Sequence, residues 1–98
     1  MNRFDALEVL RRLRPRLEAR GVAHAGVFGS VARNTSKAGS DVDVVVTPGA
    51  GRNLDLFDCG GIQTVLEEGF GASVDLIVEP IRRRDLSAAV EQDRVNAF

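Results

Sequence analysis

Apolar and polar positions alternate along the chain with two different periods, and each change of period marks an expected helix or strand. Near the N-terminus an apolar residue recurs every three or four positions, with arginines between. That spacing places apolar side chains on one face of a helix. We expect this helix to start at Asn2, to be kinked or broken at Pro15 and to end at Gly21. Its apolar positions are Phe4, Leu7, Leu10, Leu13 and Leu17.

Three short runs rich in valine and other apolar residues predict strands. The strands are expected at residues 22–28, 41–47 and 73–78. The second run contains consecutive valines, which favours burial on both faces and a central place in the sheet. Further helices are expected at residues 30–34, 54–70 and 82–96. The predicted fold class is therefore α/β (α+β): a small mixed three-stranded sheet flanked by helices, in which helices and strands alternate from a first helix to a last one.

Two carboxylates open the second strand. Asp41 and Asp43 are one residue apart, so their side chains are expected to project to the same side of the strand. Neighbouring carboxylates repel each other unless a cation lies between them, and Mg²⁺ is a hard ion that prefers oxygen ligands. Asp75 lies in the third apolar run, where an unpaired carboxylate would be costly. We therefore expect Asp75 to be a third metal ligand.

Gly29 and Ser30 lie at the C-terminal end of the first strand, and a helix-compatible Val-Ala-Arg follows them. Glycine lets a phosphate approach the backbone closely, and a helix start offers it free N–H groups. Arg33 has two interpretations: it binds phosphate, or it pairs with a nearby carboxylate and holds the short helix. The turn can meet the carboxylates if the first strand is antiparallel to the second and third, which are parallel to each other. The pattern predicts a site for a metal-bound polyphosphate.

The amino-acid composition excludes only a few classes of function. The 98 residues are 44% hydrophobic and 28% charged, with a net charge of −1. No bulk field therefore indicates nucleic acid or a membrane as a partner. Cys59 is the only cysteine, which excludes an internal disulfide. No signal sequence or membrane-spanning run is evident, so we expect a cytoplasmic protein of one small domain.

Three motifs together resemble those of a known superfamily. In chain order they are Gly29-Ser30-Val31-Ala32-Arg33, Ser40-Asp41-Val42-Asp43 and Val74-Asp75-Leu76. They resemble the motifs of DNA polymerase β-like nucleotidyltransferases and, within that superfamily, of the minimal nucleotidyltransferases (MNT). These are the antitoxin halves of HEPN/MNT toxin–antitoxin pairs. The resemblance covers nearly the whole chain, so residues 1–98 are expected to form one such domain. The family usually has glycine where this chain has Asn34, and asparagine tolerates left-handed backbone better than most residues.

The resemblance also implies roles for the site residues. The catalytic residues, which would hold two Mg²⁺ ions, are Asp41, Asp43 and Asp75. The residues that would bind the nucleotide phosphates are Gly29, Ser30 and Arg33. The implied reaction transfers AMP from ATP to a protein hydroxyl, a tyrosine of a HEPN-type toxin. Because the chain shows no acceptor-binding domain, we expect the partner protein to present that hydroxyl.

Two function classes stay open from the sequence. One is this Mg-dependent nucleotidyltransferase, and the other is a non-catalytic antitoxin, a binding module that neutralises its partner by complex formation. Three clustered carboxylates favour the enzyme, because binding alone does not need them. Phosphatases of the haloacid dehalogenase type place such a pair after an apolar strand, and glycosyltransferases that use it are far longer. The expected partners are a nucleoside triphosphate and a HEPN-type toxin, without membrane or direct nucleic-acid contact. The nucleobase, the acceptor residue and any oligomer are left open.

Overall fold

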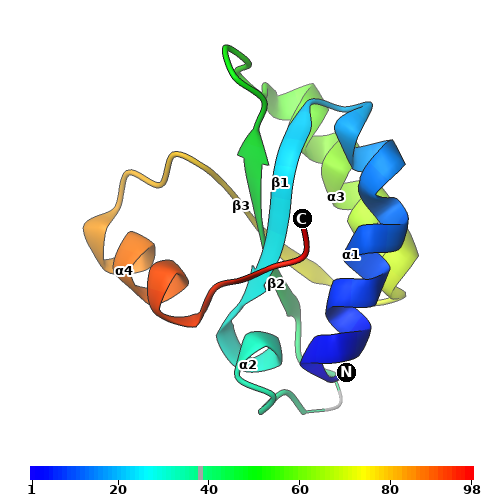
Figure 1. Cartoon of the computed structure of the whole chain (residues 1–98), viewed down its shortest axis with the longest axis vertical. Coiled ribbons are helices and arrows are strands. Elements are labelled where there is room, and N and C mark those ends of the chain that lie inside the picture. The colour runs from blue at the N-terminus through cyan, green and yellow to red at the C-terminus, as the bar shows by residue number, and fades with distance from the viewer. Residues whose placement is uncertain (38) are drawn as a thin grey trace.

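The computed structural model describes residues 1–37 and 39–98. Helices and strands follow the predicted order, with one further strand near the C-terminus (Figure 1). The helices are α1 (Arg3–Glu18), α2 (Gly29–Ala32), α3 (Leu56–Phe70) and α4 (Arg84–Asp93). The strands are β1 (Val22–Phe28), β2 (Val42–Pro48), β3 (Val74–Val78) and β4 (Val95–Asn96). No helix in this described part of the chain is both long and apolar enough to cross a lipid bilayer.

The sheet has the strand order β3-β2-β1-β4. β1 is antiparallel to β2, and β2 is parallel to β3, as the position of the predicted site requires. β2 lies between two strands, and its residues Val44, Val45 and Val46 are fully buried, so the predicted central place of this strand is confirmed. The α+β class is confirmed as well, but the sheet has four strands where three were predicted.

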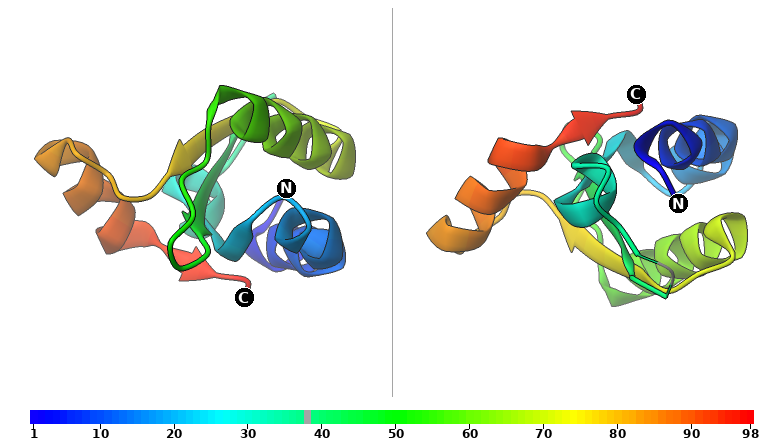
Figure 2. Two further views of the ribbon diagram at one scale, coloured as in Figure 1. Left: turned by 90° about the horizontal axis from the view of Figure 1, so that it is seen from above. Right: turned by 90° about the horizontal axis from the view of Figure 1, so that it is seen from below.

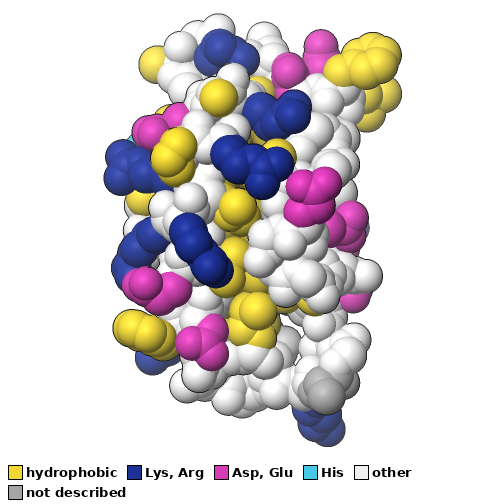
Figure 3. Space-filling model, turned by 90° about the vertical axis from the view of Figure 1, so that its right-hand side faces the viewer, with side chains coloured by type: hydrophobic (Ala, Val, Ile, Leu, Met, Phe, Trp, Pro, Cys, Tyr) yellow, Lys and Arg dark blue, Asp and Glu magenta, His cyan; other side chains and the backbone are white. Residues whose placement is uncertain are grey.

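The two long helices, α1 and α3, cover the same face of the sheet, and α4 lies on the other side (Figure 2). On this covered face the core contains Val42, Val44 and Val46 of β2. Charged side chains of α1 and α3 border an apolar seam between the helices (Figure 3). Because strand residues alternate between faces, Asp43 and Thr47 belong to the face away from these helices.

α1 starts where the sequence predicts and passes through its proline. The Asn2 side chain accepts a hydrogen bond from the Asp5 N–H at 2.8 Å. The helix continues past Pro15 to Glu18, so the alternative of a break at Pro15 is wrong. Pro15 is exposed, so water can solvate the carbonyl that the missing N–H leaves free. Phe4 was wrongly predicted to be apolar core: it lies off the buried stripe and is 68% exposed.

α3 begins two residues later than predicted, at a capping box formed by Asp55 and Asp58. Its first two residues, Leu56 and Phe57, belong to the predicted apolar pattern but are 88% and 91% exposed. The buried face of α3 starts only at Ile62. Two large apolar side chains therefore stand in solvent at the start of this helix.

The C-terminal helix is shorter than predicted, and this accounts for the fourth strand. α4 ends at Asp93, and Arg94 adopts extended backbone, so the prediction of helix through Asn96 is wrong. Val95 and Asn96 pair with the free edge of β1 at Val27 and Gly26. A Cβ on Gly26 would lie 2.7 Å from the Val95 carbonyl oxygen, so the small residue admits this pairing.

Arg94 fixes the end of α4 to the sheet. Its side chain is only 14% exposed and donates to Glu79, to Glu91 at 2.9 Å and to Thr47 at 3.3 Å. The Thr47 hydroxyl donates to the same Glu79 carboxylate at 2.7 Å. The Arg94 hydrogen bond is the main reason that the pKa of Glu79 is lowered. This network was not predicted from the sequence, and it holds α4 in a defined position relative to β2 and β3.

Candidate active site

The predicted site residues gather at one end of the sheet. β1 ends there and leads into α2, whereas β2 and β3 begin there because they run in the opposite direction. In the sheet register, Asp43 of β2 lies opposite Phe28 on one side and Asp75 of β3 on the other. Two carboxylates on neighbouring strands therefore lie beside the turn between β1 and α2.

The turn comes into close contact with a carboxylate at Gly29. Its φ is +68°, a left-handed conformation that non-glycine residues rarely adopt. A Cβ built on Gly29 would collide with the Oδ2 atom of Asp43. The Asp43 carboxylate thus lies directly against the Gly29 backbone. The missing side chain of Gly29 leaves room for this carboxylate, and its positive φ allows the chain to turn.

Asp43 is half-buried, and its surroundings disfavour its charge. Burial raises the pKa of Asp43, and the carboxylates of Asp75 and Asp41 together with a hydrogen bond to Asp75 raise it further. The positive charge of Arg33 opposes these effects. A cation placed among these oxygens would relieve the repulsion, and oxygen atoms are the ligands that Mg²⁺ prefers. The donor set therefore fits a hard divalent ion.

The other two carboxylates are more exposed than the sequence pattern suggests. Asp75 is exposed although its neighbours are apolar, so the expectation that burial makes its charge costly is wrong. β3 is an edge strand, which leaves this side chain open to solvent. Asp41 is also exposed and precedes β2, which starts one residue later than predicted. Within residues 1–37 and 39–98, no three potential ligand side chains converge into a ready-made metal centre.

Ser30 lies in the four-residue helix α2 and is half-buried. Its carbonyl oxygen accepts hydrogen bonds from the Thr35 N–H at 2.8 Å and the Thr35 hydroxyl at 3.3 Å. Asn34 has a φ of +62°, so the predicted left-handed asparagine is confirmed. Its side chain also accepts a hydrogen bond from the Arg3 N–H at 2.9 Å. Glycine could not make this bond, which ties the turn to the start of α1.

Arg33 pairs with a carboxylate, which is one of its two predicted interpretations. Its Nη1 atom donates to Oδ2 of Asp93, the last residue of α4. The Asp93 side chain is 18% exposed and that of Arg33 is 52% exposed. About half of the Arg33 side chain is therefore accessible to a ligand, and its binding to phosphate stays a prediction. Asp93 was missed, because nothing in a helical stretch of sequence indicates a partner 60 residues away.

Comparison with known proteins agrees with this arrangement. The chain belongs to the nucleotidyltransferase domain family, whose model matches residues 10–96. It is 37% identical over 89 residues to a Methanocaldococcus jannaschii protein named "Putative protein adenylyltransferase MJ0435", covering 86% of this chain and 94% of that protein. The interpretation as a nucleotidyltransferase enzyme is confirmed by this family membership.

Two solved structures have similar folds. One is described as a "putative minimal nucleotidyltransferase" and has a TM-score of 0.69 and 30% identity, matched over 97% of this chain and 95% of that chain. The other is a chain from the complex of tri-AMPylated Shewanella oneidensis HEPN toxin with MNT antitoxin. It has a TM-score of 0.69 and 16% identity, over 95% of this chain and 71% of that chain. The predicted resemblance to minimal nucleotidyltransferases is thus confirmed.

Proposed function

We propose that this protein is a Mg²⁺-dependent adenylyltransferase that transfers AMP from ATP to a tyrosine hydroxyl of a HEPN-type toxin and thereby acts as its antitoxin. The observation that carries the proposal is the contact of the Asp43 carboxylate with the Gly29 backbone, beside Asp75 on the next strand. This arrangement joins a phosphate-accessible turn to two oxygen ligands. Substrate phosphates and carboxylates are the usual ligands of Mg²⁺ in such sites.

Each site residue has a distinct proposed role. The turn at Gly29 and Ser30 receives the β- and γ-phosphates, and the open half of Arg33 neutralises part of their charge. Asp43 and Asp75, with Asp41 beside them, would hold the two Mg²⁺ ions. When bound, these ions supply activation of the attacking hydroxyl and stabilisation of the leaving pyrophosphate. The exposed Asp75 carboxylate is available to accept the proton that the hydroxyl loses.

The relatives support the choice of AMP as the transferred group and of a HEPN-type toxin as the acceptor. The Methanocaldococcus jannaschii protein is named as a protein adenylyltransferase, and the Shewanella oneidensis complex contains a toxin that carries AMP. A modified tyrosine gains bulk and negative charge, which would oppose binding of an RNA substrate. The near-neutral net charge of this chain also favours a protein acceptor over a nucleic acid, since phosphate backbones demand a basic surface.

A transfer assay tests this proposal. The chain is incubated with each labelled ribonucleoside triphosphate, Mg²⁺ and a candidate HEPN-type partner protein, and the intact mass of the partner protein is measured. We expect the addition of AMP with ATP and Mg²⁺, and no addition when EDTA replaces Mg²⁺. Peptide mapping should place the AMP on a tyrosine. An unmodified toxin in the presence of all components would overturn the proposal.

Neutralisation by complex formation alone is the second candidate. The near-complete exposure of Leu56 and Phe57 favours some protein interface on this chain. Stable association of toxin and antitoxin without ATP, together with full suppression of the toxin's RNase activity in that complex, would favour this second function over transfer.

A further inference from the structure

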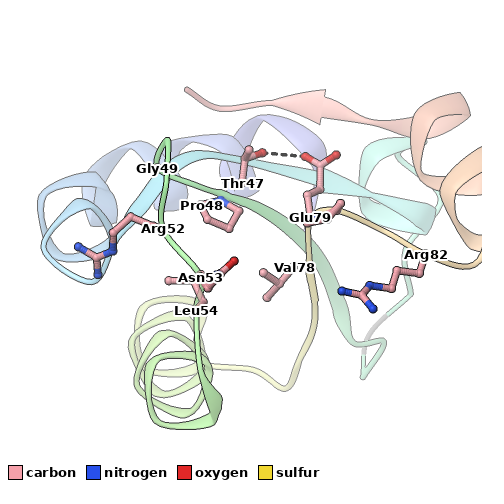
Figure 4. Close-up of a pocket in the computed structure, with 10 residues that line it drawn as sticks. Thr47, Pro48, Gly49, Arg52, Asn53, Leu54, Val78, Glu79 and Arg82 are labelled. Carbon is pink, nitrogen blue, oxygen red and sulfur yellow. Dashed lines mark hydrogen bonds between the residues drawn. The ribbon is translucent and has the colours of Figure 1, made fainter.

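Figure 4 shows a pocket of about 450 Å³ that is lined by the C-terminal ends of β2 and β3. The carboxylates lie at the other end of these two strands. Its apolar walls are Pro48, Leu54, Val78 and Pro80. Arg82 extends toward Val78 from the segment between β3 and α4 (Figure 4). The volume is sufficient for one large apolar side chain with its neighbouring backbone.

The charges around this pocket are positive on balance. The Glu79 carboxylate lines it but is paired with Arg94 and accepts from Thr47. Arg52 points away from the pocket centre (Figure 4), and a Cβ on Gly21 would lie 2.6 Å from its guanidinium, so Arg52 packs on the Gly21 backbone. Arg82 is exposed and makes no ion pair within the described part of the chain, so it can bind an anionic group.

The geometry of the proposed reaction indicates the side of the sheet from which the acceptor protein approaches. In an in-line displacement, the attacking hydroxyl and the leaving pyrophosphate lie on opposite sides of the reacting phosphorus. The turn at Gly29, next to β1, is the proposed phosphate side. The hydroxyl must therefore approach from the β3 side, where Asp75 lies and where the described part of the sheet ends.

β3 then leads from the hydroxyl to the pocket. The three residue steps from Asp75 to Val78 span about 10 Å at strand geometry. Along this strand Leu76 and Val78 pack partly against the core and keep some exposed surface, and the half-buried Ile77 lies on the opposite face of the strand. Apolar atoms of β3 are therefore accessible at its free edge. An extended protein segment that follows β3 would carry a side chain into the pocket about three residues from its modified hydroxyl.

We propose that the acceptor protein docks along β3 and inserts an apolar side chain, flanked by an acidic residue, into the pocket beside Arg82. This inference rests on the proposed function, because it takes Asp75 as the acceptor side of the active site. Leu56 and Phe57 follow the pocket residue Leu54 along the chain and are nearly fully exposed, so the same partner can cover them. Such coverage would extend the contact toward the area that a specific protein interface needs.

Charge reversal at Arg82 tests this docking. Arg82→Glu should raise the KM for the acceptor protein and its dissociation constant about tenfold, because a rim cation becomes a repulsive anion. The KM for ATP should stay within about twofold, since the pocket is remote from Gly29. The matched control is Arg84→Glu, which makes the same charge change at an exposed arginine outside the pocket. It should leave both constants within about twofold of wild type.

Phe57→Ser is a second variant that carries no folding risk, because the side chain is 91% exposed. It should also weaken acceptor binding and leave the KM for ATP unchanged. Equal acceptor binding by wild type, Arg82→Glu and Phe57→Ser would overturn the docking proposal. A change in the self-association of the chain alone would overturn it too, because the pocket would then bind a second copy.

Calorimetric titration of the acceptor keeps the two proposals separate. If wild type binds the toxin but transfers nothing, the proposed reaction fails. In that case, weaker binding by Arg82→Glu than by Arg84→Glu still supports the docking surface, and equal binding by the two variants contradicts it.

Discussion

At the scale of single residues, the contact between Gly29 and Asp43 is the most sensitive feature of the site. Gly29→Ala introduces a side chain at φ +68° and drives its Cβ into the Asp43 carboxylate. We expect a loss of stability of about 1–3 kcal/mol and a loss of transfer of at least about tenfold, because Asp43 must move. Thermal unfolding and the transfer rate measure the two effects.

Gly51→Ala provides the matched control for this variant. Gly51 also has a positive φ, +73°, but a Cβ there meets nothing within 4 Å. It should show the stability cost of the backbone conformation and keep full transfer activity. Equal transfer by the two alanine variants would contradict the role of the Gly29–Asp43 contact.

The charge of Asp43 predicts a pH dependence of stability. Since the folded chain raises the pKa of Asp43, the folded state binds more protons than the unfolded state above the ordinary value of 3.8. The free energy of unfolding therefore falls as pH rises through the raised pKa of Asp43. In EDTA, Asp43→Asn should melt a few degrees above wild type at neutral pH, where 1 kcal/mol corresponds to about 4–8 °C.

Two further measurements complete this prediction. The difference between Asp43→Asn and wild type should shrink as pH falls toward and below 3.8, because Asp43 is then increasingly protonated in both states. Mg²⁺ should stabilise wild type more than the variant. A pH-independent difference in melting temperature would show that packing, and not charge, distinguishes the two proteins.

The motifs from which the site residues are predicted are local in the sequence. Glycine before serine and aspartates in apolar runs can be recognised without the fold, and the register brings Asp43 and Asp75 together as expected. The exposure of Asp75 could not be predicted, because it depends on β3 being the edge strand. Asp93 was missed for a similar reason, since its role depends on where α4 packs.

At the scale of elements, α2 is held to α4 by the Arg33–Asp93 pair. Asp93 is mostly buried and follows the fully buried Val90 on the same helix, so the carboxylate has a fixed position. We expect Asp93 to hold Arg33 where its open donors can bind the triphosphate. Asp93→Ala should therefore weaken ATP binding about fivefold to tenfold, as measured by calorimetry with Mg²⁺.

Asp85→Ala is the matched control at the other end of α4. Its partner Arg83 and Asp85 itself are both more than 70% exposed, so loss of that pair should leave ATP affinity unchanged. In an Arg33→Ala background, Asp93→Ala should have no further effect on ATP affinity. An additional loss in that background would show that Asp93 acts on the nucleotide by another route.

Element directions were predictable, and some element ends were not. A glycine–serine turn that must meet two strand starts requires β1 antiparallel to β2 and β3, and the structure has that topology. β4 is too short, at two residues, to produce an apolar period. Its formation depends on Gly26 and on the anchoring of Arg94, which are both contacts between distant parts of the chain.

At the scale of the whole molecule, the two faces of the sheet have different surroundings. α1 and α3 cover one face of the sheet, and the carboxylates lie on strands whose other face is left to α4 (Figure 2). The proposed phosphate turn and the acceptor edge at β3 lie at the carboxylate end of the sheet. The distal pocket lies at the opposite end, where Leu54 and Val78 pack partly against the core that α1 and α3 cover. The proposed catalytic end and the proposed docking end are then about one strand length apart.

Co-expression of the HEPN toxin with wild type or with the Asp41→Ala, Asp43→Ala double variant tests the central claim most directly. The measured quantity is the intact mass of the toxin recovered from the cells, with growth recorded in parallel. We predict an AMP-modified toxin and normal growth with wild type, and an unmodified, active toxin with the folded double variant. An unmodified toxin with wild type, and full protection by the double variant, would contradict catalysis and leave neutralisation by binding.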